Sequence, residues 1–127
     1  MILSLLLGLS QAGSPPPAAT GDVVVIGERQ KTWRGFINAR GGKLSCRTRR
    51  STGDPEIDAI GCAAMTACYP AAEPRFKAAA DRKLPADERK RLMAAANQSY
   101  GECMIARRDA LIGDLADRRA AARSTGS

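Results

Sequence analysis

Four cysteines constrain the fold of this chain more than any other feature of its sequence. They are Cys46, Cys62, Cys68 and Cys103. In an exported chain, four cysteines indicate two disulfides, for which three pairings exist. The spacing lacks the close Cys-x(2–4)-Cys pairs of structural zinc sites and the Cys-x-x-Cys of redox sites. We therefore expect all four to be disulfide-bonded, with no metal and no cofactor.

Export is indicated by the first residues of the chain. Residues 1–12 form an apolar run followed by Ser10 and Ala12, which are small residues at the two positions that a signal peptidase recognises. We predict a signal peptide over residues 1–12 and a mature protein that is periplasmic or secreted in a bacterium. A membrane anchor needs about 20 apolar residues, which this run does not supply, so we expect no stable membrane insertion after cleavage.

The region that follows predicts a linker and then a single small domain. Residues 13–21 read Gly-Ser-Pro-Pro-Pro-Ala-Ala-Thr-Gly and offer nothing to bury, which is typical of a linker. The domain is expected over residues 22–123, with a frayed tail over residues 124–127. Residues 22–26 are a β-branched run between two glycines, and this pattern predicts a first strand.

A hairpin is predicted next, because residues 32–39 and 43–49 flank Arg40-Gly41-Gly42, a turn in which the glycines supply positive φ. In the second strand Leu44, Cys46 and Thr48 share one face. Cys46 is therefore expected to point toward the core.

Helices are predicted for the rest of the chain. Asp54 suits an N-cap and Pro55 the first helical position, so a helix is expected over residues 55–67, ended by Tyr69-Pro70. A short second helix is expected over residues 71–83. The longest helix is expected from about residue 84 to 122. It has an apolar stripe at helical spacing, consisting of Met93, Ala96, Tyr100, Met104, Leu111 and Leu115.

Helix geometry excludes one disulfide pairing. If Cys62 and Cys68 lie on one continuous helix, their Cα atoms are about 9 Å apart, which exceeds the limit of about 7 Å for a bridge. Each must therefore bond to Cys46 or Cys103, and two pairings remain open.

The residues from Gly42 to Cys62 read Gly-x-x-x-Cys-x-x-x-x-Ser-Thr-Gly-Asp-x-x-Ile-Asp-x-x-x-Cys. This pattern resembles a stretch of some TonB C-terminal domains, in which a strand with a cysteine leads through Ser-Ser-Gly-x-x-x-Leu-Asp into a helix with a second cysteine. The resemblance implies a related strand-turn-helix unit in an envelope setting, and it supports pairing Cys46 with Cys62, which leaves Cys68 for Cys103. TonB-type proteins have an inner-membrane anchor, a long proline-rich spacer and a closing strand, none of which is expected here.

These patterns predict an α+β fold in which a short antiparallel sheet of two or three strands is packed by helices and held by disulfides. The chain contains no histidine, which removes the commonest general base. Asp54, Glu56 and Asp58 are the acidic residues closest to a turn, but the helix start uses them. We expect a non-catalytic structural or interaction protein with an envelope protein as partner.

The net charge of +7 supports an alternative function. Basic pairs on the C-terminal helix favour a module that binds anionic envelope polymers or nucleic acid. Because basic residues are scattered among acids, a solvated basic surface is the simpler interpretation.

Overall fold

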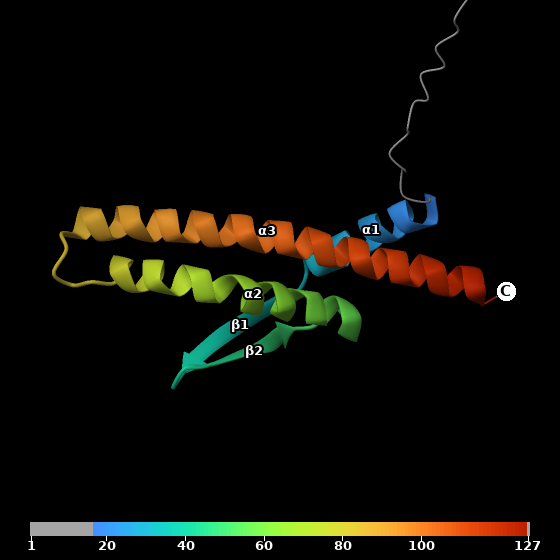
Figure 1. The fold of residues 1–127 in the computed structure, drawn as a ribbon, viewed down its shortest axis with the longest axis horizontal. Coiled ribbons are helices and arrows are strands. Elements are labelled where there is room, and N and C mark those ends of the chain that lie inside the picture. Colours follow the sequence, from blue (N-terminus) through green and yellow to red (C-terminus); the bar gives the residue numbers. More distant parts are fainter. Residues whose placement is uncertain (1–16, 127) are drawn as a thin grey trace, which may run out of the picture.

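The computed structural model describes residues 17–126, which form three helices and a two-stranded antiparallel sheet. In chain order the elements are α1 (Pro17–Gln30), β1 (Arg34–Arg40), β2 (Lys43–Arg50), α2 (Pro55–Ala79) and α3 (Ala86–Thr125). Helices α2 and α3 run side by side, the hairpin lies against α2, and α1 packs mainly on α3 (Figure 1). The expected α+β class, the antiparallel hairpin and the long C-terminal helix are confirmed. The predicted signal peptide and residues 13–16 of the predicted linker lie outside the described residues.

The strand expected over residues 22–26 was wrong, because this segment belongs to α1, as does the end of the expected linker. The side chains that α1 buries are four residues apart: Ile26 is 1% exposed and Gln30 is 3% exposed. One turn earlier, Asp22 accepts a hydrogen bond from Arg123 of α3. A spacing of four places these side chains on one helical face. Contact of that face with α3 outweighs the strand preference of the three exposed valines beside it.

The hairpin was predicted correctly. Strands β1 and β2 pair from Arg40 opposite Lys43 at the turn to Arg34 opposite Arg50 at the far end, with one irregularity beside Arg34. Gly41 and Gly42 form the turn with φ values of 59° and 75°, a region that side-chain-bearing residues rarely adopt.

Helix α2 begins as expected but does not end at Tyr69-Pro70. Asp54 caps it, since its side chain accepts hydrogen bonds from the backbone N–H groups of Glu56 and Ile57. The two short helices expected over residues 55–67 and 71–83 form one helix that continues to Ala79.

The prolines inside α2 are tolerated because of where they lie. Pro70 and Pro74 are exposed, whereas Cys68 and Ala72 are buried on the side that contacts α3. Each proline removes one helical N–H donor, which leaves a carbonyl one turn earlier without its helical partner. On an exposed face water can hydrogen-bond that carbonyl, and packing of the opposite face against α3 holds the helix together.

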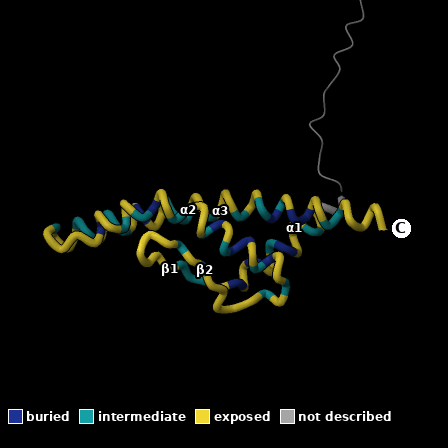
Figure 2. The backbone as a smooth tube through the Cα atoms, turned by 60° about the horizontal axis from the view of Figure 1, so that its bottom comes forward, coloured by how far each residue is buried: buried dark blue, intermediate teal, exposed yellow. Residues whose placement is uncertain are grey.

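The core lies where α1, α2 and the C-terminal half of α3 meet. Its buried members are Ile26, Ile57, Ile60, Ile112, Leu115 and Ala116, with Leu111 packed against them. The buried positions follow the faces on which the helices meet (Figure 2). Helix α3 runs two residues beyond the expected tail boundary. No helix among residues 17–126 is long and apolar enough to span a membrane.

Trp33, the only tryptophan of the chain, joins the hairpin to α2. It is 8% exposed, and its indole Nε1 donates a hydrogen bond of 2.9 Å to Thr48 Oγ1 on β2. A Cβ atom added at Gly61 of α2 would lie 2.5 Å from the indole ring, and one at Gly35 would lie 2.3 Å from it. Only glycines allow the indole to fit between the sheet and the helix at this distance.

Candidate anion-binding surface

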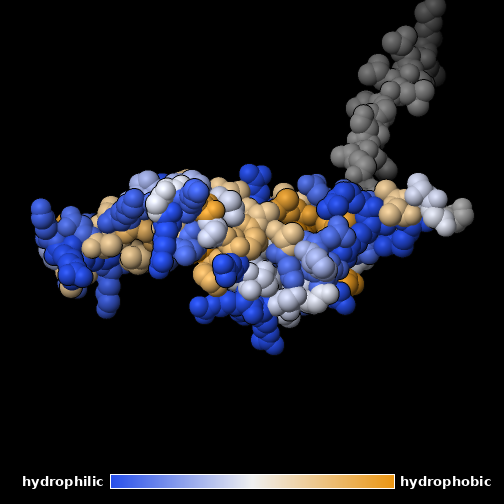
Figure 3. All heavy atoms as spheres, turned by 90° about the horizontal axis from the view of Figure 1, so that it is seen from below, coloured by the Kyte–Doolittle hydropathy of each residue, from blue (hydrophilic) through white to orange (hydrophobic). Residues whose placement is uncertain are grey.

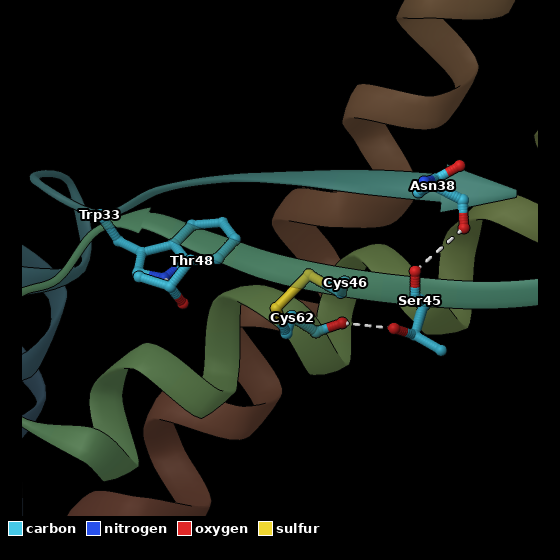
Figure 4. Close-up of a disulfide and its surroundings, with 7 residues drawn as sticks. Trp33, Asn38, Ser45, Cys46, Thr48 and Cys62 are labelled. Atoms are coloured by element: carbon cyan, nitrogen blue, oxygen red, sulfur yellow. Dashed lines mark hydrogen bonds between the residues drawn. A yellow bond between two sulfur atoms is a disulfide. The ribbon is translucent and has the colours of Figure 1, made fainter.

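Two disulfides fix the hairpin and α3 to the same helix. Cys46 of β2 bonds to Cys62 of α2, and Cys68 of α2 bonds to Cys103 of α3, with Cα–Cα distances of 5.6 and 5.9 Å. This is the expected pairing, and all four cysteines are used. Figure 4 shows the first bond crossing from strand to helix beside Trp33. The hairpin is thus held to α2 covalently as well as by packing.

The acidic residues at the start of α2 are engaged in structural contacts. Asp58 accepts hydrogen bonds from Ser51 Oγ, from Thr52 Oγ1 at 2.7 Å and from the backbone N–H of Thr52 at 2.8 Å. Although burial alone would raise the pKa of Asp58, these three donors outweigh it and hold the pKa below its usual value. Asp58 therefore fixes the turn between β2 and α2.

Asp54 and Glu56 contact arginines of α3. Arg119 Nη2 lies 2.7 Å from Asp54 Oδ2 and 3.4 Å from Glu56 Oε1, and Arg118 Nη1 lies 3.3 Å from Glu56 Oε2. Burial would raise the pKa of Asp54, but the bonds from Arg119 and from two backbone N–H groups hold it below its usual value. The basic groups at the C-terminal end of α3 are thus paired with acids.

This pairing changes where a basic surface is expected. The sequence-based alternative relied on the basic pairs of the C-terminal helix, Arg107-Arg108 and Arg118-Arg119. The first pair has no ion-pair partner among the described residues, but Arg118 and Arg119 contact acids at the start of α2, as Arg123 contacts Asp22 of α1. These guanidinium groups already have carboxylate partners. They are poor candidates for an external anion.

The net positive charge is concentrated in the hairpin. Residues 34–50 contain no acidic residue and six basic ones, namely Arg34, Arg40, Lys43, Arg47, Arg49 and Arg50. The remaining 14 basic residues of the chain are matched by 13 acidic ones, so the hairpin holds six of the seven net charges. All six side chains are exposed, and none forms an ion pair with any residue that the structure describes.

Arg47 and Arg49 alternate along β2 with Cys46, which bonds to α2, and therefore lie on the sheet surface that faces away from α2, which we call the outer face. Phe36 of β1 lies opposite Arg47 of β2, and the guanidinium of Arg49 lies 4.8 Å from the centre of the Phe36 ring. This is a cation–π contact, which keeps the Arg49 side chain extended over the sheet. Figure 3 looks onto the hairpin side of the molecule, where hydrophilic side chains project into solvent.

The register places like charges opposite each other at both ends of the hairpin. Arg34 is opposite Arg50, and Arg40 is opposite Lys43. Like charges in directly opposed positions destabilise a sheet, by up to about 1 kcal/mol per pair. Arg34 offsets part of this by donating hydrogen bonds of 2.8 Å to two backbone carbonyls. An anion bound across each pair would remove the repulsion.

A groove lies beside the turn of the hairpin. Its lining combines residues 39 and 42–44 of the hairpin with Tyr69, Pro70 and Glu73 of α2. Lys43 is the cationic residue of this lining, and Glu73 is paired with Lys77 at 2.8 Å. The groove thus offers an ammonium group beside an aromatic ring and extends the basic surface toward α2.

Sequence reasoning missed the hairpin as a binding surface, although a signal was present. Seventeen consecutive residues without an acid, in a chain with 13 acids, set residues 34–50 apart. Within the described residues, no group of three or more histidine, cysteine or acidic side chains is placed to hold a metal ion.

Comparisons with protein-family models, with curated proteins and with solved structures found no match to this chain.

Proposed function

We propose that this chain is a small, exported, non-catalytic binding protein of the bacterial envelope, whose basic hairpin binds anionic polymers. The observation that carries the proposal is the separation of charge. The hairpin has six cations without an acidic residue, whereas the remainder of the chain is close to neutral. A surface of one sign attracts polymers of the opposite sign and accelerates their encounter.

Export is supported by the cysteine chemistry. Disulfides persist in the periplasm and outside the cell, whereas cytosolic thiols are kept reduced. Two disulfides join three of the five elements here, in agreement with the predicted signal peptide. The resemblance of residues 42–62 to TonB C-terminal domains stays a prediction about ancestry and setting.

A non-catalytic role is supported by how the acidic residues are used. The sequence has no histidine. The pKa values of Asp54 and Asp58 are lowered by the hydrogen bonds that each carboxylate accepts, and for Asp54 also by Arg119. These contacts favour the charged form of both carboxyl groups. A carboxyl group that acts as a general acid near neutral pH needs the opposite shift.

A protein partner is the second candidate, and a separate surface favours it. Val24 and Val25 of α1 are 60% and 58% exposed, and Val23 beside them is 39% exposed. Adjacent exposed valines suit contact with another envelope protein. Capture of one defined envelope protein by the mature chain, lost on Val24→Ser/Val25→Ser, would support this role.

The proposed function is tested by retention on immobilised heparin as a generic polyanion. We expect the mature chain to bind at low salt and to elute as salt rises. Arg47→Gln/Arg49→Gln should elute at clearly lower salt. The matched control is Arg107→Gln/Arg108→Gln on α3, which removes the same net charge and should elute nearly as the native chain does. Equal effects of the two variants, or no retention at low salt, would refute binding through the hairpin.

A further inference from the structure

We infer that the outer face of the hairpin binds the phosphate backbone of duplex nucleic acid without regard to sequence. This inference rests on the proposed function and names its ligand. It draws on three properties of the outer face: the type of its cations, the side chains that accompany them, and its length.

The cations are mainly arginines. Five of the six basic residues of the hairpin are arginine, and Lys43 at the turn is the sixth. A guanidinium group presents its donors in a planar fork that matches two phosphate oxygens, and it loses less hydration than an ammonium group on binding. Arg47 and Arg49 lie two residues apart on β2, so their Cα atoms are about 7 Å apart and both side chains project from the outer face.

The neighbouring side chains argue against a lipid bilayer. The large hydrophobic side chains that the described residues expose are on α1 and α3: Val23, Val24, Val25 and Ile105. The hairpin therefore presents no apolar anchor of the kind that peripheral membrane segments insert among acyl chains. Its cations face water together with small polar residues such as Asn38 and Ser45, and the Ser45 hydroxyl donates a hydrogen bond to the backbone carbonyl of Asn38 across the strands.

A single strand of nucleic acid fits less well than a duplex. Non-specific single-strand binding uses several aromatic rings on which successive bases stack. The outer face has one ring, Phe36, which is partly buried and covered by the guanidinium of Arg49. The outer face can therefore recognise only the phosphate backbone of the nucleic acid. A duplex presents twice as many phosphates per unit length as one of its strands, so it is the better ligand.

The length of the hairpin sets the size of the site. From Arg34/Arg50 to Arg40/Lys43 the strand β1 advances by six residues, which corresponds to about 20 Å at 3.3 Å per residue. A duplex has one charge per 1.7 Å of axis, so about 12 phosphates, or about six base pairs, lie along this distance. The six cations are therefore spread along a length of duplex that carries more phosphates than there are cations.

This count gives the expected salt dependence. Six phosphate contacts predict a slope of about −5.4 for log K against log salt, and the affinity should fall about 10³-fold between 50 and 200 mM salt. Removing two contacts should bring the slope to about −3.6.

The experiment measures binding of the mature, oxidised chain to fluorescent 24-base-pair duplexes of two unrelated sequences, by anisotropy across a salt series. A single strand of the same length, heparin, and phosphatidylcholine–phosphatidylglycerol vesicles are the comparison ligands. We expect equal affinity for both duplexes, weaker binding to the single strand, and a slope near −5. Arg47→Gln/Arg49→Gln should lower the slope by about 2 units, while Arg107→Gln/Arg108→Gln leaves it within about 1 unit.

The two proposals fail in different ways. Binding to heparin with no binding to either duplex would overturn the duplex inference and leave the proposed function standing, whereas binding to the vesicles alone would overturn both. A preference for the single strand, or for one duplex sequence over the other, would also overturn the duplex inference. Absence of binding to every ligand at low salt would overturn both.

Discussion

Replacing Gly61 by alanine tests whether Trp33 is the side chain that seats the hairpin on α2. On helix propensity alone, Gly61→Ala should stabilise α2 by about 0.5–1 kcal/mol. The structure predicts the opposite sign. The new methyl carbon would lie 2.5 to 2.6 Å from three ring carbons of the indole, and the indole is a rigid group that is 8% exposed.

The magnitude follows from what has to move. Overpacking a filled site costs about 1–3 kcal/mol, and a displaced indole also loses the 2.9 Å hydrogen bond to Thr48, which is worth about 1 kcal/mol. Set against the gain in propensity, the net loss for Gly61→Ala is about 2 kcal/mol. For a domain of this size that corresponds to a decrease in Tm of about 8 °C.

The assay is thermal unfolding followed by far-UV circular dichroism, with Trp33 fluorescence as a local probe. Emission of Gly61→Ala should shift to longer wavelength, because the displaced indole contacts more water. The matched control is Gly113→Ala on α3, where an added Cβ meets no atom within 4 Å, and this variant should be more stable by up to about 1 kcal/mol. If Gly61→Ala is as stable as the native chain or more so, or if both variants are destabilised alike, the packing argument is refuted.

Two further predictions concern cross-links and pH. Replacing Cys68 and Cys103 by serine should cost about 3.8 kcal/mol and replacing Cys46 and Cys62 about 3.1 kcal/mol, because the loops closed span 35 and 16 residues; a reversed order in urea unfolding would contradict the chain-entropy argument. Since the pKa of Asp54 is below its ordinary value of 3.8 in the folded chain, its carboxylate stabilises the fold above that pH and the contribution is lost as pH falls through the folded pKa. Asp54→Asn keeps a capping oxygen but loses the charge, so it should be less stable than the native chain at pH 6, and the difference should shrink as pH falls below 3.8. A difference that stays constant as pH falls would exclude the linkage.

Local signals in the sequence predicted the elements that depend on local chemistry. The two glycines at the turn require positive φ, and this fixed the hairpin. Asp54 followed by Pro55 marked the start of α2 through a cap that needs no tertiary contact. Helical spacing alone excluded a bond between Cys62 and Cys68, because that argument uses only helix geometry.

The errors arose where tertiary packing overrides a local preference. Three consecutive valines favour a strand, but Ile26 and Gln30 bury one face of a helix against α3, a contact that the local pattern does not reveal. Pro70 ends most helices, yet here it lies on the exposed face of a helix that is held from the opposite side. For a related reason the basic surface was expected on α3 rather than on the hairpin. The acids that pair with Arg119 are 63 and 65 residues away in the chain, so the sequence pattern did not show that its charge is neutralised.

The two cross-links also determine which peptide bonds can be cut without separating the chain. A cleavage between α2 and α3 falls inside the loop closed by Cys68 and Cys103, and one between β2 and α2 falls inside the loop closed by Cys46 and Cys62. In both cases the fragments stay joined by a disulfide. The turn at Gly41-Gly42 lies outside both loops, so a single protease cut there would leave α1 and β1 attached by non-covalent contacts alone.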